Sequence, residues 1–441
     1  MARRPLIPSR PMRPSLALLV LLLTGCATAQ PSQTPAPDRP RNVVLMIADG
    51  FGPASATLGA AAKGAPLALD SVLVGSVETS ASDSRVTDSA AGATAYACGI
   101  KTYNGAIGVA ADGAPCRTVL EAAEGRGMAT GLVATSRITH ATPASFAAHV
   151  PDRGDEAEIA RQLAASGVDL LLGGGLSYFA VYGDGTTDAG WSVTRDRAGY
   201  DALNALPAVV LLADSHLAYE IDRDETDQPS LAEMTTKALG LLAASEDGRE
   251  RGFFLMVEGS RIDHAGHAND AAAHLYDILA YDEAVAAALA WAAADGNTLV
   301  VSTADHETGG MTLGRDGLYA WDPAPLLAVG ASFEALVATV EALGPDDDPA
   351  EVVRQALGRD ALDDATADAL RGAVSSGDPA ALTVLVRDLE SEPAGIGWTT
   401  GGHTAVDVGL YAFGRGADLF HGRMTNAAVG RALFEALGLD R

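Results

Sequence analysis

Basic residues are scarce in this chain of 441 residues. Lys and Arg together number 30 against 57 Asp and Glu, which gives a formal net charge of −27 at pH 7. A nucleic-acid-binding surface needs a basic stripe or patch, and the sequence contains none, so we exclude that function. Because an acidic surface also repels anionic ligands, any anion site must take its positive potential from metal ions, an Arg or a helix N-terminus.

Cysteine motifs that bind zinc are also missing. The chain has three cysteines, Cys26, Cys98 and Cys116, without a CxxC pair or the Cys/His spacing of a structural zinc site. Cys98 and Cys116 form an even pair in a chain that we expect to be exported. This favours a disulfide, which would stabilise the fold by roughly 3 kcal/mol. Two buried thiols are the alternative.

The apolar run near the N-terminus, residues 16–23, is too short to span a bilayer. Arginines precede it, as in a secretory signal, and it ends in Leu23-Thr24-Gly25-Cys26, which resembles a bacterial lipobox. We therefore predict a lipoprotein-type signal peptide over residues 1–26, a lipid anchor at Cys26 and a flexible tether over residues 27–41. An ordinary signal peptide is the alternative. Either way we expect an exported protein, periplasmic or at the cell surface, and with the lipid anchor it would be attached to a bacterial membrane.

Continuous apolar runs predict buried strands in the rest of the chain, and longer segments between them predict helices. The predicted strands are residues 42–47, 128–134, 168–172, 253–257, 298–302 and 408–413. The predicted helices are residues 117–124, 156–165 and 271–293. This alternation predicts an α/β domain over residues 42–441, with a mostly parallel central sheet and helices on both faces.

Residues 313–397 interrupt this alternation, and we predict that they form an inserted helical cap segment. Asp348-Pro349-Ala350-Glu351 has the spacing of a capping box with Pro at the first helical position, and Asp378-Pro379 indicates another helix start. The insertion either shapes substrate access or a subunit contact, or is a solvated decoration.

Residues 87–97 predict a turn followed by a helix of small residues. Asp88 stands at the N-cap and Ser89 in the first turn, where unpaired backbone N–H groups and the helix dipole favour anions. Small neighbours would let a substrate approach the backbone closely. The stretch therefore holds either a nucleophilic Ser89 or a capped, Ala-rich core helix.

Side chains that bind metals follow three of the predicted strands. They are Asp49, the carboxylates and imidazoles of residues 258–267, and the pair Asp305-His306, with His403 between glycines before the last strand. An isolated Asp after a strand is also a common turn residue. However, ligands of open α/β sheets bind outside the carboxyl ends of the strands, so these segments are expected to converge. Their mixture of His and carboxylates suits zinc.

Seven motifs, in this order, resemble those of the metal-dependent alkaline phosphatases. They are Asp49-Gly50, Asp88-Ser89-Ala90, Lys101-Thr102-Tyr103-Asn104-Gly105, His140-Ala141-Thr142-Pro143-Ala144, Val257-Glu258-Gly259 with Ile262-Asp263-His264, Thr303-Ala304-Asp305-His306, and Gly402-His403-Thr404. The resemblance covers residues 42–310 and continues from residue 397 to the C-terminus. It implies the alkaline phosphatase fold, hydrolysis of small phosphate monoesters with broad specificity, and a homodimer.

The resemblance further implies a site with three metal ions. One Zn²⁺ would be held by Asp263, His267 and His403. A second Zn²⁺ would be held by Asp49, Asp305 and His306. A Mg²⁺ would share Asp49 and be bound by Thr142 and Glu258.

Two catalytic roles are implied in the same way. Ser89 would attack phosphorus to form a phosphoserine, and Arg153 would bind the phosphate. These roles are physically reasonable because a free Ser hydroxyl barely ionises at neutral pH and no His is a sequence neighbour of Ser89, so activation by a metal is required. A guanidinium also offers two parallel donors to phosphate oxygens.

Two positions depart from the best-known bacterial pattern and resemble the animal-type enzymes instead. His140 stands where an Asp orients the magnesium waters, and His264 stands where a Lys lies near the phosphate, so both are possible outer-shell residues. If His140 binds directly, Zn²⁺ or Co²⁺ would replace Mg²⁺ at the third site. The remaining histidines match no ligand position, and we interpret them as structural or surface residues: His149, His216, His274 and His421.

Two other functions compete with this interpretation. The same metal scaffold resembles phosphodiesterases, phosphoglycerate mutases and sulfatases, but Ser89 with Arg153 favours monoesters, and Ser89-Ala90-Ala91-Gly92-Ala93 is not a sulfatase motif. A non-catalytic lipoprotein that binds phosphate or metal is the rival from another class. Such proteins typically lose the nucleophile or a ligand, and here none is lost.

Overall fold

The structure is a computed structural model that describes residues 39–182, 191–344, 346–377 and 379–441. The predicted signal peptide, Cys26 and most of the predicted tether lie outside the described residues. Arg41, the last residue of that tether, donates its backbone N–H to the Asn297 carbonyl at 2.8 Å, so the folded part includes it. Of the helices described, none has both the length and the apolar character needed to cross a membrane.

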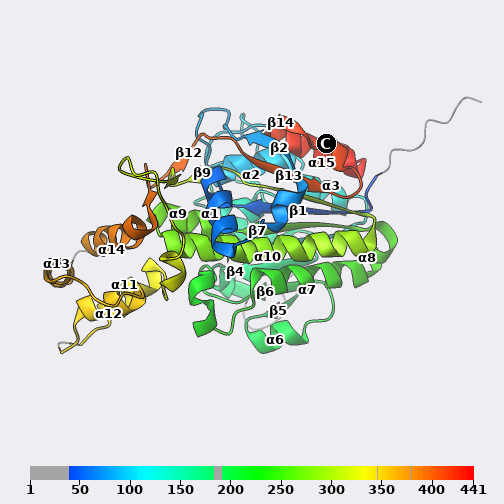
Figure 1. Ribbon diagram of the computed structural model, residues 1–441. Helices are drawn as coiled ribbons and strands as arrows, with labels where there is room; N and C mark the ends of the chain where they lie inside the picture. Colours follow the sequence, from blue (N-terminus) through cyan, green and yellow to red (C-terminus); the bar gives the residue numbers. More distant parts are fainter. Residues whose placement is uncertain (1–38, 183–190, 345, 378) are drawn as a thin grey trace, which may run out of the picture. The chain divides into compact units, whose positions relative to one another are not determined.

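A ten-stranded sheet forms the centre of the described chain, in the order β14-β2-β13-β8-β1-β7-β3-β4-β6-β5 (Figure 1). Its strands are β1 (Asn42–Ala48), β2 (Leu73–Glu78), β3 (Ala129–Arg137), β4 (Leu170–Gly174), β5 (Ser192–Thr194), β6 (Ala208–Leu211), β7 (Phe253–Gly259), β8 (Thr298–Thr303), β13 (Val408–Phe413) and β14 (Gly422–Thr425). All neighbours are parallel except the two pairs that β13 makes with β2 and β8. The prediction of a mostly parallel sheet is therefore confirmed.

The strands that the sequence predicted are those with long apolar runs. All seven residues of β1 are buried, because β7 and β8 flank it and helices cover both faces of the sheet. The sequence did not predict β2, β5 and β14, because these strands are short or partly exposed and lack such a run. Strand β6 was also not predicted, although its four residues are apolar and buried. The antiparallel direction of β13 was also beyond prediction, since an apolar run carries no information about strand direction.

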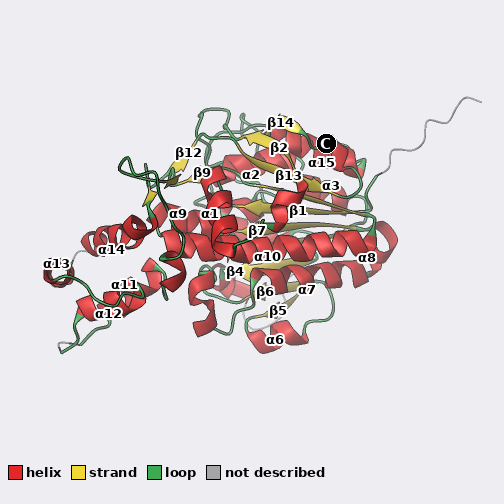
Figure 2. Cartoon of the chain, in the orientation of Figure 1, coloured by secondary structure: helices red, strands yellow, loops and turns green. Residues whose placement is uncertain are grey.

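Helices cover both faces of the sheet (Figure 2). Helices α7 (Leu231–Ala244) and α10 (Ala271–Asp295) pack on one face, and α2 (Ser89–Cys98), α3 (Val119–Glu124) and α15 (Asn426–Leu437) lie on the other. The remaining helices of this part are α1 (Pro53–Lys63), α4 (Ala141–Ala144), α5 (Glu156–Ala165), α6 (Arg197–Ala202), α8 (Glu246–Arg251) and α9 (Arg261–Ala268). The predicted helices over residues 117–124, 156–165 and 271–293 correspond to α3, α5 and α10.

In its described residues, the segment predicted as an insertion contains four α-helices, α11 (Phe333–Glu341), α12 (Pro349–Ala356), α13 (Asp364–Ser376) and α14 (Pro379–Ala394), and a short 3-10 helix at Leu326–Ala328. Strands β10 (Thr312–Leu313) and β11 (Ile396–Gly397) pair antiparallel where the chain leaves and returns. The helices share an apolar cluster with Leu58 of α1 and Leu275 of α10. The insertion is thus packed against the part of the fold that carries the sheet.

The capping of the insertion's helices differs in one detail from the prediction. Asp348 caps α12 by accepting the Ala350 N–H at 3.1 Å. The reciprocal half of the predicted capping box is wrong, because Glu351 pairs with Arg354 at 2.7 Å. Helix α14 begins at Pro379, whereas the predicted cap residue Asp378 lies outside the described residues.

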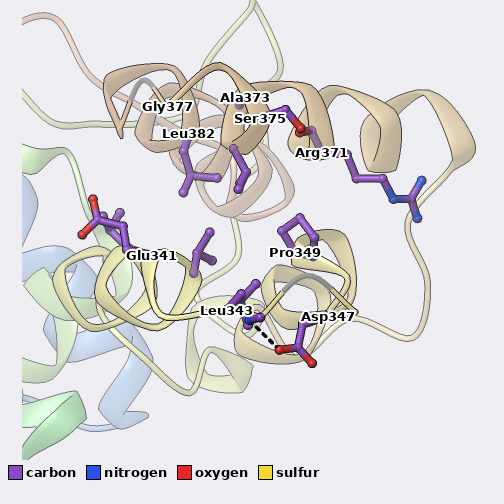
Figure 3. Close-up of a pocket in the computed structure, with 13 residues that line it drawn as sticks. Glu341, Leu343, Asp347, Pro349, Arg371, Ala373, Ser375, Gly377 and Leu382 are labelled. Atoms are coloured by element: carbon purple, nitrogen blue, oxygen red, sulfur yellow. Dashed lines mark hydrogen bonds between the residues drawn. The ribbon is translucent and has the colours of Figure 1, made fainter.

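A cavity of about 530 Å³ lies among these four helices (Figure 3). Its aliphatic lining residues are Val337, Val340, Leu343, Val374 and Leu382. Arg371 extends its guanidinium away from the cavity and pairs with Asp348 at 2.7 Å. The cavity contains none of the predicted site residues.

The local geometry of α2 confirms the prediction for residues 87–97. Asp88 is the N-cap residue, and its carboxylate accepts the Ala91 N–H at 3.0 Å. Ser89 is the first residue of the helix and is buried. The predicted disulfide is also confirmed, because Cys98 at the end of α2 is bonded to Cys116.

Helix α15 packs closely against α2 at Gly430, and we predict that a methyl group added at this glycine would disrupt the contact. A Cβ on Gly430 would lie 2.4 Å from the Ala95 carbonyl oxygen of α2. Gly430→Ala should therefore lower the free energy of unfolding by about 1–3 kcal/mol and displace the helix that carries Ser89. Urea unfolding of the variant measures this change.

The matched control for this prediction is Gly240→Ala in α7. A Cβ there would meet nothing within 4 Å. Because Ala has the higher helix propensity, this variant should gain about 0.5–1 kcal/mol. Equal stability of the two variants would contradict the proposed close contact between α2 and α15.

Candidate active site

The carboxyl ends of three adjacent strands bring the predicted ligands together. β1 lies between β7 and β8 and is parallel to both, with Ile47 opposite Glu258 on one side and Thr303 on the other. Asp49 follows β1, Glu258 lies near the end of β7, and Asp305 follows β8. Residues that are hundreds of positions apart therefore meet at one edge of the sheet, as expected for an open α/β fold.

Three groups of ligand-type atoms form at this edge, and within each group the atoms lie within 4.8 Å of one another. The groups are Asp263, His267 and His403; Asp49, Asp305 and His306; and Asp49, His140 and Glu258. The first two are the sets that the sequence assigned to two zinc ions. In the third, His140 joins the expected Asp49 and Glu258, while the Thr142 hydroxyl is buried without a hydrogen-bond partner.

In the first group, the Nε2 atoms of His267 and His403 face each other, and each carries a lone pair. His267 places Nδ1 2.7 Å from the Gly401 carbonyl, and His403 places Nδ1 2.8 Å from the Thr87 carbonyl. A carbonyl only accepts, so each Nδ1 carries the proton in the neutral ring and each Nε2 presents a lone pair. The two Nε2 atoms are only 3.0 Å apart and lie within 3.6 Å of Asp263 oxygens. Such an arrangement of electron pairs fits a bound cation.

Thr308 connects the first two groups. Its hydroxyl lies 2.5 Å from Asp263 Oδ1 and 3.2 Å from His306 Nδ1, and its backbone N–H donates to the Gly50 carbonyl. A hydroxyl has one proton, and an ionised carboxylate can only accept. The proton of Thr308 therefore goes to Asp263, and His306 donates from Nδ1. This leaves the His306 Nε2 lone pair directed at Asp49 and Asp305, at 3.4 and 3.3 Å.

The carboxylates of the site are buried and under-satisfied. Both oxygens of Asp49 and one oxygen each of Glu258 and Asp305 lack a hydrogen-bond partner. Burial, reinforced by neighbouring carboxylates, raises the pKa of Asp49 well above its usual range and that of Asp305 to about 8. Burial also raises the pKa of Glu258 to about 7. Buried oxygens without partners are costly, so this cluster fits the binding of divalent cations.

Ser89 lies beside the second group. Its Oγ is 3.2 Å from His306 Nε2, a proximity that the sequence did not reveal, since the two residues belong to α2 and to the loop after β8. Next to it, Asp88 accepts from Arg153 Nη1 at 3.0 Å while it caps α2. The salt bridge holds the Arg153 guanidinium beside the start of the helix that carries Ser89, where an anion is favoured.

The two possible outer-shell histidines lie together with a third. His140 Nε2 is 3.2 Å from Arg153 Nη2, and the centres of the His140 and His264 rings are 5.4 Å apart. His216, which we interpreted as structural or surface, packs 4.3 Å from His264 and 5.5 Å from His140. His216 belongs to none of the three ligand groups, which fits a structural role, and its ring is part of this histidine cluster.

The other three histidines have contacts that fit the structural or surface interpretation. His149 pairs with Glu121 at 2.7 Å, and this carboxylate raises the pKa of His149. His274 is buried and contacts Ser55 Oγ at 2.9 Å. His421 Nδ1 lies 2.9 Å from the Asp418 carbonyl at the exposed surface.

The fold and the site together define a metal-binding α/β enzyme with a serine hydroxyl at the edge of its metal-ligand cluster. The family model described as alkaline phosphatase matches residues 40–205 and 188–439. A repressible alkaline phosphatase of Saccharomyces cerevisiae is 40% identical, over 90% of this chain and 80% of its own length.

Solved structures agree with this match. The cold-active alkaline phosphatase of a psychrophilic Shewanella species has a TM-score of 0.82 and 34% identity, and covers 90% of this chain and 99% of its own. A histidine-to-aspartate mutant of the alkaline phosphatase of the Antarctic bacterium TAB5, with Mg bound in a site named M3, has a TM-score of 0.67 and 31% identity, with 91% and 99% covered. The chain belongs to the alkaline phosphatase family and is an enzyme, a phosphoric monoester hydrolase.

Thr308 generates the first prediction about the site. Thr308→Val keeps the shape of the side chain but removes the proton for Asp263 and the acceptor for His306 Nδ1. Loss of such a partner typically lowers metal affinity about 10–100-fold. We expect a loss of this size for Zn²⁺ in a chelator competition assay, and recovery of affinity in Thr308→Ser, which restores the hydroxyl. Unchanged affinity in the valine variant would contradict the bridging role.

The raised pKa values of the carboxylates generate a second prediction, for removal of the metals. A carboxyl whose pKa is about 4 in the unfolded chain and about 8 in the fold, as for Asp305, binds more protons when folded between these values. The stability of metal-free protein should therefore fall as pH rises from about 4 to about 8. Bound cations replace those protons, so the stabilisation by metal should increase over the same range.

Thermal unfolding of chelator-treated and of zinc- and magnesium-loaded protein, measured at several pH values, checks this expectation. Asp305→Asn should flatten the pH dependence of the metal-free protein, since the amide does not titrate. A metal-free melting temperature that stays constant or rises between pH 5 and pH 8 would contradict the pKa assignment.

Proposed function

We propose that the enzyme hydrolyses phosphate monoesters of broad structure through a covalent phosphoserine on Ser89. The observation that carries this proposal is the position of the Ser89 hydroxyl at the start of α2, 3.2 Å from His306 Nε2 and beside the Asp88–Arg153 pair. The proposed nucleophile Ser89, the ligand group of His306 and the Arg153 guanidinium, which we propose binds the phosphate, thus lie close together. Recognition of the phosphate group alone would leave the alcohol in solvent, which accounts for broad specificity.

Two zinc ions and one magnesium ion are the metals that we propose for the three groups. Imidazole and carboxylate ligands suit zinc in the groups of His403 and His306, and oxygen ligands suit magnesium near Glu258 and Thr142. The TAB5 structure with Mg in its M3 site is a mutant in which Asp replaces a His, so it supports a third metal position rather than magnesium itself in a chain that carries His140. His140 is the residue that would favour Zn²⁺ or Co²⁺ there. When bound, the cations would lower the pKa of the serine hydroxyl and stabilise charge on the phosphate oxygens.

The chain's own residues account for the rest of the reaction. Ser89 Oγ attacks phosphorus and gives up its proton, the bond from phosphorus to the ester oxygen breaks, and the alcohol leaves with that proton. Water then attacks the phosphoserine, which releases inorganic phosphate and restores the hydroxyl. Arg153 is 28% exposed at its side chain and pairs with Asp88, so it can present its guanidinium to the phosphate while it remains tied to α2.

Export and lipid attachment at Cys26 are part of the same proposal. They are supported by the order of charged residues, apolar run and lipobox-like tetrapeptide in the sequence. The Cys98–Cys116 disulfide fits an oxidising compartment outside the cytoplasm.

Covalent trapping tests the role of Ser89. Incubation with labelled phosphate followed by acid quenching should leave label on the wild-type protein and none on Ser89→Ala, which lacks the attacking oxygen. Turnover of a chromogenic monoester should fall by at least about a thousandfold. Ser71→Ala, at an exposed hydroxyl in the segment before β2, is the control and should label normally. Label retained by Ser89→Ala would mean that another residue attacks phosphorus.

A further inference from the structure

Arg261 is a buried arginine that the proposed reaction does not use. It is the first residue of α9, the helix that also carries Asp263, His264 and His267. Only 3% of the residue is exposed, and its guanidinium lies 3.6 Å from the centre of the Tyr219 ring. An arginine is rarely buried to this degree without specific partners, so its contacts indicate what it does.

The Arg261 guanidinium joins the active-site helix to the helical insertion. Its Nη1 is 3.0 Å from Nδ1 of His264, and its Nη2 donates to Glu334 Oε2 at 2.7 Å. Glu334 belongs to the first turn of α11, in the insertion, and 69% of its side chain is exposed. One planar group thus connects the insertion to an imidazole of the histidine cluster.

The first contact determines where His264 carries its proton. A guanidinium can only donate, so Nδ1 of His264 must accept and has no proton. The neutral ring therefore carries its proton on Nε2, on the ring edge away from Arg261. His264 thus presents an N–H donor in the cluster where His140 contacts Arg153, the proposed phosphate-binding residue.

The second contact is held in place from the insertion side. The first turn of α11 is bonded to the rest of the fold through its backbone. The Ser332 N–H donates to Asp222 at 2.9 Å, and the Phe333 N–H donates to Asp270 at 2.7 Å. These bonds fix the start of α11, so that Glu334 meets Arg261 although its side chain is largely in solvent.

We propose that Arg261 is a positioning residue for the phosphatase reaction. It fixes His264 as an N–H donor in the histidine cluster where His140 contacts Arg153, and Glu334 of the insertion holds Arg261 in this orientation. The insertion would thus act on the reaction through one carboxylate–guanidinium–imidazole chain. This inference rests on the proposed function of the Ser89 site.

Steady-state kinetics of Glu334→Ala test the insertion's part in this chain. The variant removes an exposed carboxylate, so we expect a folded protein with wild-type zinc content. Its kcat should fall on the order of tenfold with a smaller change in KM, because the misaligned donor is needed at the transition state. Glu351→Ala is the matched control. Glu351 also lies in the first turn of an insertion helix and pairs with an arginine at 2.7 Å, but its partners Arg354 and Gln355 belong to its own helix, α12. Equal kcat values for the two variants would overturn the proposal.

Nitrogen NMR of histidine-labelled, metal-loaded protein tests the tautomer directly. The His264 signals, identified by their loss in His264→Gln, should show an unprotonated Nδ1 and a protonated Nε2 in the wild type. In Arg261→Met, which keeps the length but removes the donors, a fraction of Nδ1 should become protonated. A wild-type proton on Nδ1, or an unchanged tautomer in Arg261→Met, would overturn the proposal.

The two experiments separate this inference from the proposed function. If the phosphoserine on Ser89 is wrong, acid quenching of the wild type fails to trap label there, while the NMR result for His264 is unaffected. If only the inference is wrong, the phosphoserine forms normally and either the tautomer or the kcat of Glu334→Ala fails to respond.

Discussion

Repulsion between carboxylate oxygens and imidazole lone pairs at the carboxyl edge of the sheet is the interaction on which the rest of this structure depends. Carboxylate oxygens of Asp49 and Asp305 and the Nε2 lone pairs of His267, His306 and His403 converge there within a few ångströms of one another. These atoms repel each other in a buried setting, and either protons on the carboxylates or cations between the ligand atoms relieve the repulsion. The fold therefore holds these ligand atoms close together despite their repulsion. Relief of that repulsion when a cation binds contributes to the affinity of the site for metal ions.

The apolar sequence made the framework of this site predictable. The runs that became β1, β7 and β8 predicted buried strands of a mostly parallel sheet, and the polar residues after them predicted a common edge. The cap at Asp88 predicted where α2 begins and hence where Ser89 lies. These features depend on short segments whose physical requirements are visible in the sequence itself.

What escaped prediction are contacts between side chains from distant segments. Nothing near Thr308 in sequence indicates that its hydroxyl bridges Asp263 and His306, and nothing near His216 places it beside His264. The same holds for Arg261 and Glu334, which are separated by 73 positions. Such contacts are set by the packing of whole elements, and a single sequence carries no periodic signal for them. The direction of β13 belongs to the same class.

Each of the three histidines of the cluster contacts an arginine. Arg137 contacts His216, Arg153 contacts His140, and Arg261 contacts His264.

Each of these three guanidiniums also pairs with a carboxylate at 3.0 Å or less, provided by Glu156, Asp88 and Glu334. The carboxylate compensates the charge of the arginine, and the arginine in turn requires a lone pair on the imidazole. The cluster therefore holds neutral rings of fixed orientation beside a site that binds cations and an anion.

The insertion takes part in this pattern through one of the three carboxylates. A solvated decoration would contact the rest of the fold only through its apolar base, yet the first turn of α11 is bonded to Asp222, Asp270 and Arg261. Two of these bonds fix backbone N–H groups and the third reaches an active-site helix. Because Glu334 and His264 share the Arg261 guanidinium, a displacement of the start of α11 would change the contact that Arg261 makes with His264. The insertion is therefore connected to the site through the Glu334–Arg261–His264 contacts, although its helices carry none of the proposed metal ligands.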